Sequence, residues 1–170
     1  MDYLKRLFNI LSWPVYICIA AYLLIAAPLI GGYRPVVVLS GSMEPAYHVG
    51  SVVYYKQVPF EQIEVGSPIT FHAGEGGALV THRVIEKQEV SQQFVTKGDA
   101  NESADPNPVA YSSVAGKTAG ISIPYAGYFV TYGKQPVIIG IMAAILILGI
   151  LLDSIAGKKK PDEGEKENEK

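Results

Sequence analysis

The sequence predicts a mainly β protein, in which a compact antiparallel β domain is flanked by two transmembrane helices. Two observations lead to this prediction. Long apolar runs lie near both ends of the 170-residue chain. Between them, short runs of β-branched and aromatic residues alternate with Gly, Pro, Asn and Asp. A chain of this length holds one ordinary domain and its anchoring segments, and little else.

The first apolar run covers residues 8–30 and contains no charged residue. A helix of this length crosses the roughly 30 Å of hydrocarbon in a bilayer. Pro14 lies near the start of the run, where membrane helices tolerate a kink. A cleavable signal peptide is the alternative interpretation. The length of the run, and the need to place a second run as well, favour a retained transmembrane helix.

The second apolar run covers residues 136–152, with Asp153 at its boundary, and is shorter, so its flanks must reach the membrane interface for it to span. Tyr125, Tyr128 and Tyr132 precede it, as expected of an aromatic belt at a membrane surface. This run therefore predicts the second transmembrane helix.

Basic residues beside the two runs predict the topology. Lys5 and Arg6 precede the first run, and Lys158, Lys159 and Lys160 follow the second. Under the positive-inside rule, both termini are then cytoplasmic. We expect the following order: a cytoplasmic N-terminus (1–7), a transmembrane helix (8–30), an extracytoplasmic β domain (31–135), a transmembrane helix (136–153) and a charged cytoplasmic tail (154–170).

The middle segment contains five candidate strands bounded by turn residues. No stretch of it keeps a helical apolar period over three turns, and no internal repeat is present. An antiparallel barrel-like or two-sheet domain is therefore expected. The candidate strands cover residues 36–39, 51–55, 68–71, 78–85 and 93–97.

Composition argues against several kinds of function. The net charge is -2, and no stretch combines clustered Lys and Arg with aromatic residues, so we expect no nucleic-acid partner. Cys18 is the single cysteine, which leaves no disulfide framework and no cysteine metal site within one chain. His48 and His72 have no supporting motif of metal ligands. We expect neither a metal nor a cofactor.

Polar clusters in the middle segment contain the candidate chemistry. In the segment Ser40–Pro45, Gly41 permits a sharp turn that can present the Ser42 hydroxyl and backbone N–H groups at one point, as acyl transfer requires. An ordinary polar turn is the alternative interpretation.

His82 lies in an otherwise apolar strand, and Asp99 and Asp105 lie in the loop that follows the last candidate strand. Taken singly, such a histidine is more often a packed or exposed side chain, and such acids more often bond to their own backbone. Together with Ser42 they supply a nucleophile, a base and an orienting carboxylate.

The order of these clusters resembles that of type I signal peptidases. The motifs are Ser-Gly-Ser-Met-Glu-Pro, then Thr-His-Arg-Val, then Lys-Gly-Asp-Ala-Asn with a further Asp. The resemblance is to the endoplasmic-reticulum, archaeal and sporulation-associated branch, which pairs its serine with a histidine. The bacterial housekeeping branch has a lysine where His82 stands. One departure is Gly66-Ser67, where many relatives have Gly-Asp.

The resemblance implies a role for each site residue. Ser42 would be the nucleophile and His82 the general base. The Ser40 hydroxyl would assist an oxyanion hole beside the backbone N–H of Ser42. Asp105 would orient His82 while Asp99 supports the site structurally, although the two acids could exchange these roles.

The resemblance also implies a signal-peptidase-like β catalytic domain and a function. The chain would be a membrane-bound serine endopeptidase that removes N-terminal signal peptides from secreted and membrane preproteins, cleaving after small residues. Its partners would be these preproteins, the lipid bilayer and the protein translocation machinery, in the cell membrane or the endoplasmic-reticulum membrane. Two alternatives remain: a membrane protease for a narrow precursor set, and a non-catalytic β subunit of a membrane complex.

Overall fold

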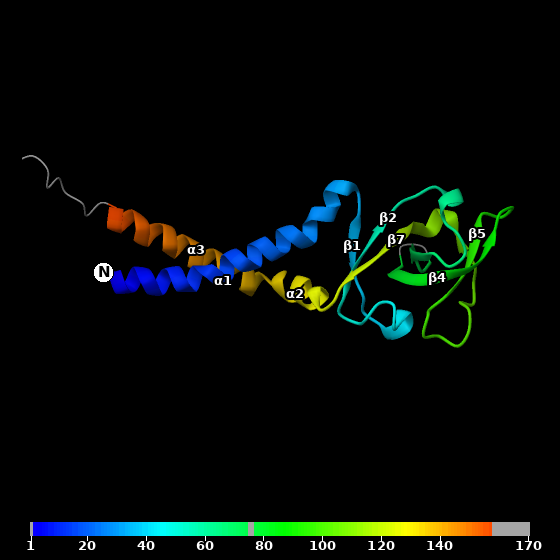
Figure 1. The fold of residues 1–170 in the computed structure, drawn as a ribbon, viewed down its shortest axis with the longest axis horizontal. Coiled ribbons are helices and arrows are strands. Elements are labelled where there is room, and N and C mark those ends of the chain that lie inside the picture. The colour runs from blue at the N-terminus through cyan, green and yellow to red at the C-terminus, as the bar shows by residue number, and fades with distance from the viewer. Residues whose placement is uncertain (1, 75–76, 158–170) are drawn as a thin grey trace, which may run out of the picture. The chain divides into compact units, whose positions relative to one another are not determined.

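The computed structural model describes residues 2–74 and 77–157, and these form two compact units (Figure 1). The larger unit is Leu24–Thr131, and the helical segments before and after it form the smaller one. The helices are α1 (Asp2–Ala26), α2 (Ala126–Gly133) and α3 (Pro136–Gly157), with 3-10 turns η1 (Ala27–Gly31), η2 (Gly41–Met43), η3 (Phe60–Gln62) and η4 (Tyr111–Ser113). The strands are β1 (Arg34–Val37), β2 (Val52–Lys56), β3 (Pro68–His72), β4 (Leu79–Gln88), β5 (Gln93–Lys97), β6 (Val109–Ala110) and β7 (Val114–Ile123).

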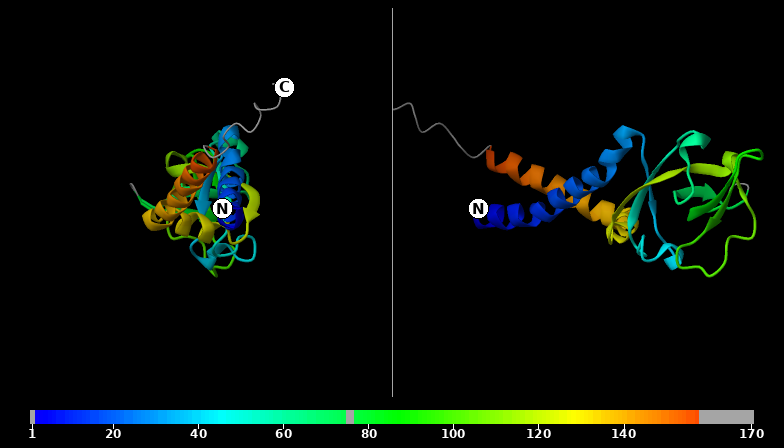
Figure 2. Two further views of the ribbon diagram at one scale, coloured as in Figure 1. Left: turned by 90° about the vertical axis from the view of Figure 1, so that its left-hand side faces the viewer. Right: turned by 45° about the vertical axis from the view of Figure 1, so that its right-hand side comes forward.

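The strands form one antiparallel sheet of seven strands in the order β1-β2-β7-β3-β4-β5-β6. The register shifts where β7 pairs with β2 and β3, and again between β4 and β5. Such bulges bend strands and increase their twist, and the sheet is accordingly curved (Figure 2). The prediction of a mainly β, antiparallel protein is confirmed. All the described strands belong to this one curved sheet, so of the two predicted arrangements, barrel-like and two-sheet, the two-sheet one is wrong.

The main hydrophobic core lies under β3, β4 and β5. Alternate residues of β5 are buried, which is the period expected of a strand with one face on a core. Phe94 is fully buried there, and its ring centroid lies 5.0 Å from that of Phe60. Ile69 and Val84 complete the centre of this cluster. The core thus fixes β4, which carries His82, and β5, which leads into the loop that contains Asp99 and Asp105.

The helical segments support one membrane span by length and composition. That span is Ser12–Gly31, with a mean hydropathy of 2.1. α3 reaches the same criterion only together with α2, from which it is bent by 79°. The second predicted transmembrane helix, residues 136–153, therefore stays a prediction. Lys158, Lys159, Lys160 and the rest of the predicted tail lie outside the described residues.

Candidate active site

Ser42 lies in the middle of η2, the short turn that follows β1. Ser40 is extended, with φ −133° and ψ 159°, and the chain then turns through Gly41. The next residue, Met43, is only 2% exposed and packs with Tyr47 and Val53. Because Met43 anchors the turn in the core, its neighbour Ser42 is held at the surface of the sheet.

His82 connects Ser42 to Asp105. His82 Nε2 lies 3.2 Å from Ser42 Oγ, and His82 Nδ1 lies 2.7 Å from Asp105 Oδ2. The histidine is on β4 and 8% exposed, and the aspartate follows β5. An ionised carboxylate only accepts hydrogen bonds, so it favours the tautomer with the proton on Nδ1. Nε2 is then left to accept the Ser42 proton.

Thr96 on β5 fixes the Asp105 carboxylate. Its hydroxyl donates to Asp105 Oδ2 at 2.5 Å, and its carbonyl oxygen accepts the Asp105 backbone N–H at 2.8 Å. Thr96 is fully buried. The Phe71 ring packs edge-on against the imidazole, with ring centroids 6.3 Å apart. These contacts restrict the histidine to the orientation that faces Ser42.

Asp99 pairs with Arg83 rather than with His82. Arg83 Nε donates to Asp99 Oδ1 at 2.8 Å, and Nη2 donates to Oδ2 at 2.6 Å. The bond to Asp99 is the main reason that the pKa of Arg83 is raised. The third guanidinium nitrogen, Nη1, donates to the Gly66 carbonyl at 2.8 Å. In that turn, the Ser67 hydroxyl accepts the Glu64 N–H at 3.2 Å.

The loop that carries Asp99 also holds the backbone of Ser42. The Ala100 N–H donates to the Ser42 carbonyl at 2.9 Å. A Cβ at Gly98 would lie 2.6 Å from that same carbonyl oxygen, so only glycine permits this approach. The Arg83–Asp99 ion pair is therefore linked to Ser42 through the backbone of this loop, while Asp105 is linked to Ser42 through His82.

Ser40 lies beside the nucleophile. Its hydroxyl oxygen is 3.4 Å from Ser42 Oγ, and the residue is exposed. A rotatable hydroxyl at this place can turn toward negative charge that develops on a carbonyl bound at Ser42.

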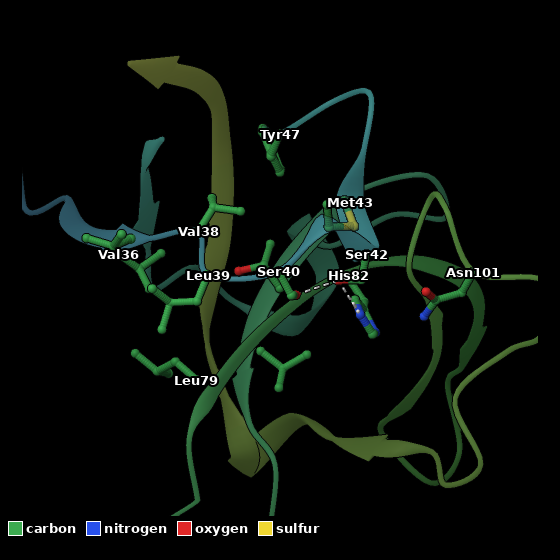
Figure 3. A pocket seen from close by; sticks show the side chains of 13 residues that line it. Val36, Val38, Leu39, Ser40, Ser42, Met43, Tyr47, Leu79, His82 and Asn101 are labelled. Carbon is green, nitrogen blue, oxygen red and sulfur yellow. Dashed lines mark hydrogen bonds between the residues drawn. The ribbon is translucent and has the colours of Figure 1, made fainter. Parts of the chain in front are cut away.

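A pocket of about 340 Å³ opens at Ser42 and His82. Figure 3 shows Ser40, Ser42 and His82 in the middle of its lining, with apolar side chains on one side and Asn101 on the other. Tyr47 contributes a buried phenol, and burial is the main cause of its raised pKa. The apolar side chains of the lining are Val36, Val37, Val38, Leu39, Met43, Leu79 and Val80.

The other histidines lie apart from this site. His48 pairs with Glu44 on the surface at 3.3 Å, and His72 Nδ1 lies 3.3 Å from the Gly77 carbonyl oxygen. Among residues 2–74 and 77–157, no group of three or more His, Cys, Asp or Glu side chains is placed to hold a metal ion.

Sequence reasoning missed Thr96 and the partner of Asp99. Thr96 follows Phe94 by two residues, so strand alternation places both on one face, and a hydroxyl on a core face needs a partner. Arg83 follows His82 directly, so the two side chains point to opposite faces of β4. Strand alternation alone could therefore have indicated that His82 and Arg83 pair with different aspartates.

A serine hydroxyl, an imidazole and a carboxylate in hydrogen-bond sequence define the class of site that serine hydrolases use. No family model matches the chain. It is 37% identical over 100 residues to signal peptidase I W of Bacillus subtilis (strain 168), which is 57% of this chain and 52% of that protein. It is 36% identical over 110 residues to the signal peptidase complex catalytic subunit SEC11C of Homo sapiens and of Canis lupus familiaris, covering 58% of this chain and 57% of each relative.

These similarities confirm the resemblance to type I signal peptidases that the motifs predicted. The chain spans about half the length of the curated relatives it matches.

Proposed function

We propose that this chain is a membrane-bound serine endopeptidase that removes N-terminal signal peptides from preproteins, cleaving after small residues. The observation that supports it best is the hydrogen-bonded series Ser42–His82–Asp105 at the mouth of an apolar pocket. The similarity to signal peptidases supports the choice of substrate.

The geometry suggests an acyl-transfer mechanism. His82 Nε2 takes the proton of Ser42 as Oγ attacks the scissile carbonyl. The oxyanion that forms accepts hydrogen bonds from the Ser42 backbone N–H and the Ser40 hydroxyl. His82 then gives its proton to the leaving amine, and later activates the water that hydrolyses the Ser42 ester. Asp105 stabilises the imidazolium through its hydrogen bond with Nδ1–H, while Asp99 supports the loop that holds Ser42.

The first pocket, defined by the lining given above, receives the residues before the cut. Ser42 and His82 both line it, and its apolar walls come mainly from the end of β1, the residues just after it and the start of β4. A packed wall rejects bulk by steric clash more strongly than it rewards a missing methylene. This favours Ala, Gly or Ser directly before the cut over Leu or Phe.

The membrane arrangement belongs to the same proposal. Residues 8–30 and 136–153 form transmembrane helices, residues 31–135 form the extracytoplasmic catalytic domain, and residues 1–7 and 154–170 are cytoplasmic. The enzyme then works in the cell membrane or the endoplasmic-reticulum membrane, next to the bilayer that holds its substrates. The apolar span Ser12–Gly31 supports the first anchor. The translocation machinery that delivers preproteins is the expected protein partner.

The proposal is tested by cleavage of a synthetic precursor with the purified full chain. Ser42→Ala and His82→Ala should each lower kcat by about 10⁴-fold or more, and the double variant should lose hardly more, because the groups act as a unit. His48→Ala is the matched control, since this histidine is exposed and lines no pocket described here. It should keep full activity. Turnover by Ser42→Ala at the wild-type rate would refute the proposal.

A further inference from the structure

A second pocket, of about 570 Å³, lies next to the first, and the mechanism above does not use it. Val80 and His82 line both pockets, so these two residues stand between them. Ser42 lines only the first pocket. The base therefore has one pocket on the side of the nucleophile and another beyond it.

The second pocket is largely apolar. It lies between the end of β3 and the segment that leads from Asp105 to β6. Phe71 and Val109 are each 6% exposed and belong to the main core, so they form fixed walls. Pro106 and Pro108 line the pocket and stiffen this segment.

A peptide cleaved at Ser42 has a part on each side of the base. The acyl part must lie at Ser42, in the first pocket. The imidazole that takes the serine proton must pass it to the leaving amine, so the residues after the cut must lie against His82. His82 borders both pockets described here, and the one that Ser42 does not line is the second pocket.

We propose that the second pocket binds a side chain of the leaving part of the substrate, and that it favours an apolar one. In an extended peptide, successive side chains point to opposite sides. One of the first two residues after the cut therefore points into this pocket. This inference rests on the proposed endopeptidase function and adds a specificity site on the product side of the cut.

The first test varies the substrate. Precursors that share one sequence before the cut carry Leu, Gly or Asp at both of the first two positions after it. Burial of a leucine side chain against Phe71 and Val109 should raise kcat/KM by about tenfold over Gly, and more over Asp, whose charge would be desolvated.

The second test moves the preference with a charge at Asn107, an exposed residue of the pocket lining. Asn107→Asp and Asn107→Lys are compared on precursors with Glu or Lys at the same two positions. The ratio of the two kcat/KM values cancels any effect of the substitution that both precursors share. Asn107→Lys should shift the ratio toward Glu, and Asn107→Asp toward Lys, each by about two- to fivefold.

Gln57→Glu and Gln57→Lys are the matched controls, because Gln57 is exposed and lines neither pocket. They should leave the ratio unchanged. If the wild type cleaves the precursors but shows no preference for Leu, and neither Asn107 variant shifts the ratio, the second pocket is not a substrate site and the proposed function stands. If the wild type cleaves none of the precursors, the proposed function fails, and this inference fails with it.

Discussion

At the scale of single residues, the site depends on how one carboxylate oxygen is shared. Asp105 Oδ2 accepts both the Thr96 hydroxyl and the His82 Nδ1–H. Both donors thus hold the same oxygen of a carboxylate that is mostly buried. Thr96 is itself fully buried and cannot turn away to water. It acts as a positioning residue, because it touches the acid and not the substrate.

Thr96→Val should test this role, because it removes the hydroxyl and keeps the shape of the side chain. Asp105 loses one donor and gains freedom to rotate, so the imidazole is held less firmly. We expect kcat to fall by about tenfold, with KM little changed, and stability to fall by about 1 kcal/mol. Steady-state kinetics and urea unfolding of the full chain measure the two effects.

Thr70→Val is the control for that change. Thr70 is also fully buried on a strand, and its hydroxyl bonds to Thr81 at 2.9 Å. It should lose similar stability but keep kcat. Equal loss of kcat in both variants would mean that Thr96 matters only for folding.

Sequence alone located these residues better than it paired them. Ser42 and His82 stand in recognisable motifs, so their candidacy needed no structure. Asp99 and Asp105 occupy one loop, six positions apart, and each is an acid near the end of β5. Their partners depend on which way the loop turns after Lys97. That direction is set by contacts distant in sequence, including the Ala100 bond to Ser42.

At the scale of elements, β7 shows what local patterns cannot predict. It is central in the sheet, between β2 and β3, yet no candidate strand was assigned to it. Its residues include two glycines, Gly116 and Gly120, and two alanines, which have low strand propensity. Strand β5, in contrast, lies where the pattern predicted it, at residues 93–97. Its β-branched and aromatic residues have the preference that its place in the sheet requires.

Gly116 explains why β7 departs from the pattern. A Cβ at this residue would lie 2.5 Å from the carbonyl carbon and oxygen of Lys56 on β2. The two backbones thus approach more closely than any side chain permits. We expect Gly116→Ala to destabilise the larger unit, Leu24–Thr131 (the β unit), by about 1–3 kcal/mol, measured by urea unfolding followed by circular dichroism.

Gly140→Ala provides the comparison, since a Cβ there meets nothing within 4 Å. This helical residue should tolerate the methyl group without loss of stability. If Gly116→Ala unfolds at the same urea concentration as the wild type, the close approach of β2 and β7 is not what keeps glycine at this position.

At the scale of the whole molecule, the proposed function requires the site and its substrate to meet at one membrane surface. Ser42 follows the end of the candidate span at Gly31 by about a dozen residues, so the anchor limits how far the nucleophile can move from the bilayer and raises the effective concentration of a membrane-held substrate. This advantage exists only if the β unit lies on the side to which preproteins are delivered. The topology is therefore the decisive property at this scale.

Accessibility of single cysteines should establish that topology. Cys18 lies in the candidate span, so it is first replaced by serine. Val90, between β4 and β5, is fully exposed and suits a cysteine probe for the β unit. Lys166, outside the described residues, suits a probe for the C-terminal end.

We expect an impermeant maleimide to label Val90→Cys in intact cells or right-side-out vesicles, and to label Lys166→Cys only after permeabilisation. The physical reason is the basic residues Lys5, Arg6 and Lys158–Lys160, which the positive-inside rule keeps in the cytoplasm. The Cys18→Ser chain without a probe gives the background. Labelling of both probes in intact cells would mean that the chain crosses the membrane once. Labelling of Lys166→Cys alone would put the β unit in the cytoplasm, away from secreted preproteins, and would rule out signal-peptide removal on the extracytoplasmic side.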